Sequence, residues 1–86
     1  MKKTMTADLV RANGKPTLGI RPLDGKKFTC DEINQHIGGW FENAKCLDGR
    51  HAYIDEEGLL KHLPLNPIAS QLLGQPIVGD VLILNA

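Results

Sequence analysis

The chain has 86 residues, 42% of them hydrophobic, and its ten basic and ten acidic side chains give a formal net charge of zero. This length predicts a single domain over residues 1–86 with a thin core, because a chain of this size buries only about 60–65% of the surface that it exposes when unfolded. The charge balance argues against general nucleic-acid binding, and no apolar run reaches the roughly 18 residues of a membrane-spanning helix.

The first predicted element is a β-hairpin within residues 1–22. Apolar and polar residues alternate loosely over 5–12, and again with period two over 16–21. An Asn-Gly pair separates the two runs, and this dipeptide is the strongest short-range signal for a two-residue hairpin turn. We therefore predict paired strands over 5–12 and 16–21.

A short helix is predicted over residues 30–37. Thr29 is placed to act as its N-cap, and Glu32 follows three residues later, which is the pattern of a capping box. Gly38 and Gly39 end the helix, because glycine readily takes the left-handed conformation that closes a helical segment.

A second hairpin is predicted from strands over 40–47 and 51–55, joined by an Asp-Gly turn. Trp40, the single tryptophan, opens the first of these strands. We expect its ring to lie in the core, because a domain this small has few large apolar side chains to spare. The acidic residues 55–57 precede a glycine and are expected to form a solvated turn.

The C-terminal part predicts a second short helix and a final strand. Asn66 holds the N-cap position, Pro67 the first helical position and Gly74 the stop. Loss of the Asn66 cap is expected to cost about 1 kcal/mol. The run 81–84, VLIL, lacks polar alternation, which indicates a strand buried on both faces at the centre of a sheet.

The order of these elements predicts an α+β fold: a small, mostly antiparallel sheet of about five strands with two short helices. The sequence contains no catalytic or metal-binding pattern. Its three histidines lack the spacing with which imidazoles share a metal, and its single serine is not in a nucleophile-elbow context. Cys46 and His51 flank the second hairpin turn, and we interpret them as a pair with no joint role. We predict a protein that is not an enzyme and has no cofactor or metal.

Cysteine usage and the N-terminus both bear on location. Cys30 and Cys46 have no short spacing, which is typical of a reduced intracellular protein rather than a secreted disulfide scaffold. The N-terminus begins like a signal peptide, but Asp8 and Arg11 interrupt any apolar segment. We therefore expect a cytoplasmic protein.

Side chains of the second hairpin are candidates for contact with a ligand or partner. Trp40 and Tyr53 are expected on neighbouring strands, with Lys45 and Arg50 near them. Exposed aromatic rings beside cationic groups can stack on bases and are typical of binding hot spots. If Trp40 is exposed rather than buried, these four side chains are the leading candidates for a binding site.

Residues 23–84 resemble a family known only as domain of unknown function 3846. The similarity lies in the combination of LDG at 23–25, IGGWFE at 37–42, YIDEEG at 53–58, LPLNPIASQLLG at 63–74 and PIVGDVLIL at 76–84. The N-terminal hairpin carries less of this pattern. The resemblance implies a small protein of bacteria, phages or plasmids without an assigned activity, and it transfers no site residue.

Three hypotheses for function follow. The first is a non-enzymatic binding module, encoded by a phage or another mobile element, that acts on an unidentified host protein. The second is a binder of a small anionic ligand such as a nucleotide, using backbone donors near Gly38 and Gly39 and the ring of Trp40. The third is weak nucleic-acid binding. Its candidate contacts are Lys26, Lys27, Lys45 and Arg50. No membrane partner is expected, and the sequence leaves the oligomeric state open.

Overall fold

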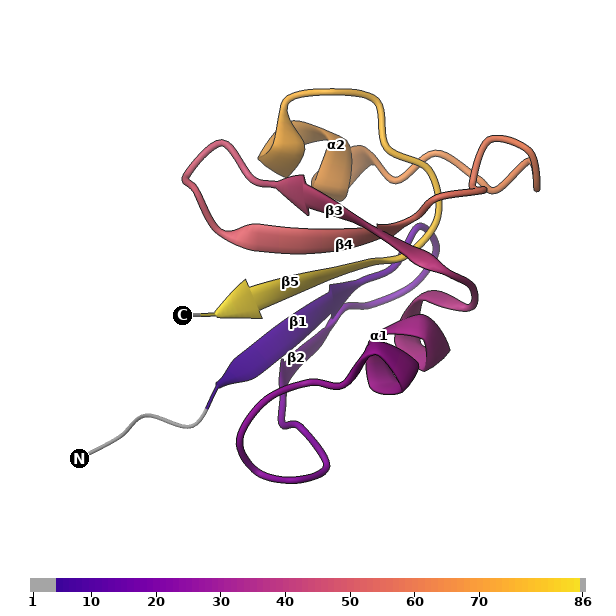
Figure 1. The fold of residues 1–86 in the computed structure, drawn as a ribbon. Helices are drawn as coiled ribbons and strands as arrows, with labels where there is room; N and C mark the ends of the chain where they lie inside the picture. Colours follow the sequence, from indigo (N-terminus) through magenta and orange to yellow (C-terminus); the bar gives the residue numbers. More distant parts are fainter. Residues whose placement is uncertain (1–4, 86) are drawn as a thin grey trace.

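The computed structural model describes residues 5–85, which form one antiparallel sheet with strand order β2-β1-β5-β4-β3 and two helices (Figure 1). This confirms the predicted α+β fold. Neither helix in this part of the chain is long and apolar enough to cross a membrane. The elements in chain order are β1 (Thr6–Val10), β2 (Thr17–Ile20), α1 (Cys30–Ile37), β3 (Phe41–Lys45), β4 (His51–Asp55), α2 (Pro67–Leu73) and β5 (Val81–Asn85).

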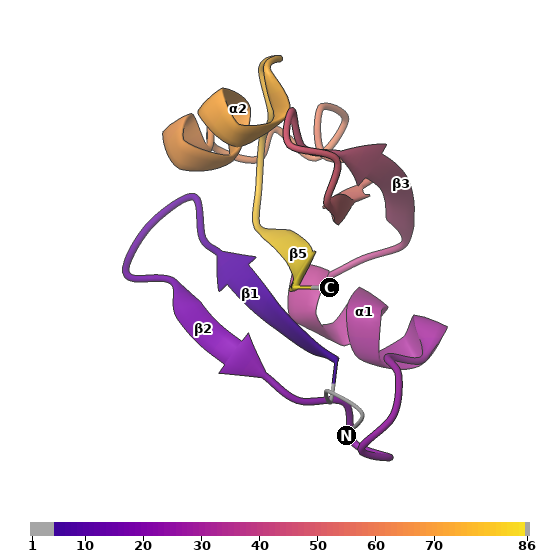
Figure 2. The same ribbon diagram turned by 90° about the vertical axis from the view of Figure 1, so that its left-hand side faces the viewer.

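The strand β5 is central, as its unbroken apolar sequence predicts. It pairs with β1 on one side and with β4 on the other. Val81 and Ile83 pack in a cluster with Ala69 and Leu73 on the α2 side, whereas Leu82 belongs to the cluster on the α1 side. Successive side chains of a strand point to opposite faces, so this one strand contributes to both halves of the core. Figure 2 shows the two helices on opposite sides of the sheet.

The helix α1 begins and ends where the sequence predicts. The hydroxyl of Thr29 accepts a hydrogen bond from the N–H of Glu32 (3.2 Å), and the carboxylate of Glu32 accepts one from the N–H of Thr29 (3.0 Å). This confirms the capping box. Gly38 has a left-handed backbone, with φ 87°, and ends the helix. Ile33 and Ile37 lie on its buried face.

Asn66 confirms the predicted start of α2, but it does more than cap the helix. Its Oδ1 accepts a hydrogen bond from the N–H of Ala69 (3.0 Å), as an N-cap does. Its Nδ2 donates to the carbonyl oxygens of Val10 (3.0 Å) and Gly79 (2.9 Å). These three bonds tie α2 to the end of β1 and to the segment before β5. The residue is fully buried.

Both hairpins are shorter than predicted. The strand β1 ends at Val10, and the N–H of Ala12 then donates to the side chain of Asp80 (3.0 Å) rather than to a neighbouring strand. The edge strand β2 contains Gly19 with φ 69°, and its register with β1 is irregular. The strand β3 likewise occupies only the middle of the predicted range 40–47.

The prediction of a solvated turn over 55–57 is wrong for Asp55. This residue is the last of β4 and is 6% exposed. Its carboxylate accepts the N–H of Glu57 (2.8 Å) and pairs with the ammonium group of Lys61 (2.8 Å), because the following loop folds back over the strand end. The hydrogen bond with Asp55 raises the pKa of Lys61. Gly39 leaves room for this pair, since a Cβ there would lie 2.8 Å from the Asp55 Oδ2.

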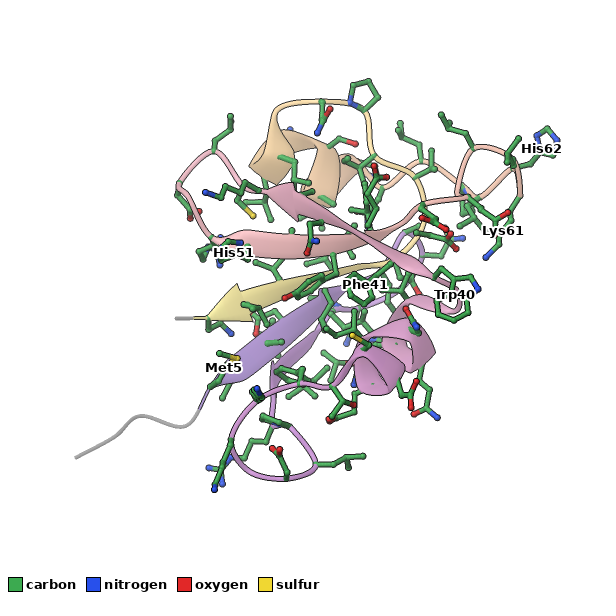
Figure 3. The ribbon with its side chains drawn as sticks, in the orientation of Figure 1. Met5, Trp40, Phe41, His51, Lys61 and His62 are labelled. Atoms are coloured by element: carbon green, nitrogen blue, oxygen red, sulfur yellow. The ribbon has the colours of Figure 1, made fainter. Side chains whose placement is uncertain are left out.

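The prediction that Trp40 lies in the core is also wrong. Its side chain is 67% exposed and lies at the same end of the sheet as Lys61 (Figure 3). The next residue, Phe41, takes the inward position and packs edge-on against Tyr53, with ring centroids 5.0 Å apart. Neighbouring residues of a strand point to opposite faces, so only one of two adjacent aromatic rings can enter the α1-side cluster.

We expect Trp40→Ala to change the free energy of unfolding by no more than about 0.5 kcal/mol, as for other exposed positions. Iodide should strongly quench tryptophan fluorescence in the folded protein. Chemical denaturation of Trp40→Ala and Phe41→Ala, followed by circular dichroism, compares the two neighbours directly. Phe41→Ala should be clearly less stable, and a larger loss for Trp40→Ala would contradict the exposed position.

Candidate functional site

The β3–β4 hairpin has a shallow, open hollow of about 510 Å³ on the face of the sheet that α1 partly covers. Two cross-strand pairs form it: Asn43 lies opposite Tyr53, and Lys45 lies opposite His51. Side chains at directly opposite positions of an antiparallel pair share one face. The pairing of β3 with β4 therefore brings these four polar side chains together, and Ala44 completes the lining.

The hollow has an aromatic floor and a basic rim. The half-buried ring of Tyr53 packs against Phe41, which holds it in place. Lys45 and His51 are exposed at the end of the hollow nearest the hairpin turn. None of the five lining residues carries a carboxylate. The arrangement can therefore accept an anionic or hydrogen-bonding group.

The outer edge of β3 lies beside this hollow. The N–H of Cys46 donates to the carbonyl of Arg50 (2.8 Å), and the carbonyl of Trp40 accepts the N–H of Glu56 (3.0 Å). These bonds identify the residues whose backbone groups face β4, and in an antiparallel ladder such residues alternate with those that face away. Asn43 and Lys45 therefore direct their N–H and C=O groups away from the sheet.

This free edge is limited at both ends. The N–H of Phe41 donates to the side chain of Asn34 (3.0 Å), and the N–H of Leu47 donates to the carbonyl of Leu72 in α2 (2.8 Å). Within residues 5–85, the outward backbone groups of Asn43 and Lys45 have no hydrogen bond to another segment. We call these groups the β3 window.

The four binding candidates predicted from the sequence do not lie together in one site. Lys45 and Tyr53 both line the hollow. Trp40 lies at the opposite end of the hairpin from His51, so it cannot form a stacking platform there (Figure 3). Arg50 is bound within the turn, where its Nε lies 2.8 Å from the Asp48 carboxylate.

The turn between β3 and β4 uses the charge of Arg50 locally. The backbone N–H of Arg50, and then its guanidinium group, donate to the Asp48 carboxylate and hold the pKa of Asp48 below its usual value. Lys26 and Lys27 lie in a separate loop, where their backbone N–H groups likewise lower the pKa of Asp24. The four cations suggested for nucleic-acid contact are thus not gathered on one loop.

Sequence reasoning missed Asn43 and His51. A signal was present, because the Asp-Gly turn places Lys45 opposite His51 once the hairpin is counted outward from it. Cys46, by contrast, lies in the cluster on the α2 side, where burial raises the pKa of its thiol. Cys46 and His51 therefore lie on opposite faces. Both cysteines are free, and residues 5–85 contain no group of three or more His, Cys, Asp or Glu side chains that could hold a metal.

Comparisons with known proteins agree with the resemblance seen in the sequence. Searches of curated proteins and of solved structures found no match. The model of one family, the domain of unknown function 3846 (DUF3846), matches residues 5–86, so it extends beyond 23–84 and includes the N-terminal hairpin. Because this match covers nearly the whole chain, the protein belongs to the DUF3846 family.

Proposed function

We propose that this domain is a non-enzymatic protein-binding module that pairs β3 with an extended segment of a partner. The observation that carries the proposal is the β3 window beside the hollow. Strand addition to an exposed sheet edge is a recurring mode of peptide recognition, in which backbone hydrogen bonds supply affinity and neighbouring pockets supply specificity. The two residues of the window offer a donor and an acceptor each.

The size of the window defines the bound segment. In an antiparallel pair, one partner residue exchanges both hydrogen bonds with Asn43, and a second, two positions away, does so with Lys45. Each hydrogen bond contributes about 0.5–1.5 kcal/mol net, so backbone pairing alone gives weak binding. Side-chain contacts in the hollow must therefore supply the remaining affinity and the specificity.

The other edge of the sheet is a poorer template. The strand β2 has four residues, a left-handed Gly19 within them and an irregular register with β1. Irregularities of this kind interrupt the row of backbone groups that a new strand needs. The strand β3 keeps a regular register with β4 over all five of its residues.

We take the partner to be a protein of a bacterial host, in line with the phage and plasmid context that the sequence resemblance implies. The module would act on it as an accessory factor in the cytoplasm, where free cysteines stay reduced. The two free cysteines of the chain are consistent with that environment.

Asn43→Pro should weaken this binding and leave the fold intact. Its N–H points away from β4, and proline is tolerated on an edge strand at such a position. The wild-type domain, panned against a phage-displayed library of random heptapeptides, should enrich extended sequences. Their affinity, measured by fluorescence anisotropy, should fall about two- to tenfold for Asn43→Pro, since it loses one backbone donor in the contact.

Trp40→Ala is the matched control, because its exposed ring lies outside the hollow. It should bind the selected peptides like the wild type, and circular dichroism should show both variants folded. Failure to enrich any peptide, or equal binding by a folded Asn43→Pro variant, rules out strand addition at β3.

A small anionic ligand in the hollow is a second candidate function, supported by the presence of Lys45, His51 and Tyr53 in its lining. Such a ligand relies on the side chains of Lys45, His51 and Tyr53 and does not need the backbone N–H of residue 43. Binding of adenosine monophosphate, followed by NMR shifts of the hollow residues, would therefore survive in Asn43→Pro. That result, together with the absence of peptide binding, would favour the small ligand over the partner protein.

A further inference from the structure

We propose that the partner segment carries an acidic side chain, which lies opposite Lys45 at the rim of the hollow. This inference rests on the proposed function, because it specifies the chemistry of the segment that pairs with the β3 window. It is carried by the different charges on the two faces of β3.

The first step concerns the face toward the hollow. A partner residue that exchanges backbone hydrogen bonds with Lys45 has its side chain on the same face as Lys45, with the two Cβ atoms roughly 5 Å apart. His51 lies directly across from Lys45 on the next strand. The partner side chain, the ammonium group and the imidazole therefore lie in one row across the sheet.

The second step concerns charge. Lys45 and His51 are both exposed, and the hollow has no carboxylate among its lining residues. The cation nearest to Lys45 in sequence, Arg50, has its Nε paired with the Asp48 carboxylate. An acidic side chain opposite Lys45 gains an opposite-charge cross-strand pair, whereas a basic one meets a like charge.

The third step concerns the other face. The partner residue one position toward Asn43 lies opposite Ala44, with its side chain on the α2 side and Glu42 as its diagonal neighbour. Glu42 is exposed and carries a negative charge. A shift of one residue moves a strand's side chains to the opposite face, so an acidic residue displaced by one position toward Asn43 leaves Lys45 and becomes a diagonal neighbour of Glu42. The charges on β3 thus favour an acidic partner side chain opposite Lys45 and disfavour one at the next position toward Asn43.

The orientation of the partner strand follows from the window. Every strand pair of this sheet is antiparallel. In that arrangement each window residue exchanges both bonds with a single opposite residue, and antiparallel pairing is slightly more stable per residue than parallel pairing. We therefore assign an antiparallel orientation to the bound segment.

Alternate N-methylation of synthetic peptides tests this arrangement, because it fixes which residues can turn their N–H groups toward β3. The probes are three terminally blocked heptapeptides of valine and threonine. The first has a central aspartate with a free N–H and N-methyl groups on the two flanking residues. The second has an N-methylated central aspartate and free flanking N–H groups. The third replaces the aspartate of the first by asparagine.

In an NMR titration of the wild-type domain, we expect the first peptide to bind about two- to fivefold more tightly than the asparagine peptide and about tenfold more tightly than the second peptide. It alone places a carboxylate beside Lys45. Lys45→Glu should remove this preference, whereas Lys26→Glu should retain it because Lys26 lies on a separate exposed loop. The asparagine peptide thus tests the carboxylate, the second peptide tests the face on which it lies, and Lys45→Glu tests the charge opposite it.

The outcomes also separate this inference from the proposed function. Equal binding of the aspartate and asparagine peptides, with weaker binding of both to Asn43→Pro, overturns the acidic preference and retains strand pairing. Tighter binding of the second peptide overturns the antiparallel assignment. Peptides that do not bind, or that bind Asn43→Pro unchanged, overturn both proposals.

Discussion

Asn66→Ala should lower the free energy of unfolding by about 3–5 kcal/mol, well beyond the 1 kcal/mol expected for a simple cap. Loss of an N-cap costs about 0.5–2 kcal/mol. The same change removes the donor to the carbonyls of Val10 and Gly79, and a buried polar group left without a partner costs about 1–3 kcal/mol. Asn66 is fully buried, so water cannot readily replace these bonds.

Thr29→Ala provides the matched control for this prediction. Thr29 caps α1 in the same way, but it is exposed and lies at the surface. Its loss should cost about 1 kcal/mol, the usual value for a cap. Urea denaturation of both variants measures the difference, and equal losses would show that the two carbonyl contacts of Asn66 contribute little.

Leu82→Ala should cost about 3–4 kcal/mol, within the range measured for buried leucine in other proteins. Leu82 is fully buried in the central strand, where it lies opposite Leu9 on β1 and Tyr53 on β4. Truncation of Leu82 leaves a cavity that is enclosed by the two neighbouring strands and by the buried residues under α1. Because small domains have marginal stability, the variant should be partly unfolded at moderate temperature.

Leu60→Ala removes the same atoms from a side chain that is 77% exposed. It should change stability by no more than about 0.5 kcal/mol. Thermal unfolding of both variants, followed by circular dichroism, compares a central leucine with a surface leucine. A Leu82→Ala variant as stable as Leu60→Ala would argue against β5 as the centre of the core.

Most of the secondary structure could be predicted because its signals act over a few residues. The capping box of Thr29 and Glu32 and the left-handed Gly38 define α1 through contacts within one or two helical turns. The N-cap and the terminal glycine do the same for α2. The apolar run of β5 predicted its central place because a strand covered on both faces cannot expose polar residues.

The candidate site was predictable only in part. Lys45 and Tyr53 were identified from their residue types, but their partners in the hollow, Asn43 and His51, depend on the register of the hairpin. The free edge of β3 depends on the strand order, which places β4 on one side of β3 and leaves the other side open. The local pattern of β3 does not show that this strand forms an edge of the sheet.

The sequence by itself therefore determined the helix boundaries, the Asp-Gly turn of the second hairpin, the buried terminal strand and the α+β class. Only the tertiary structure decided that Trp40 is exposed, that Asp55 is buried with Lys61 and that Asn66 joins three segments. Caps and turns depend on neighbours within about four residues, which the sequence displays directly. Burial and long-range hydrogen bonds depend on residues such as Val10, 56 positions from Asn66, which only the folded chain brings into contact.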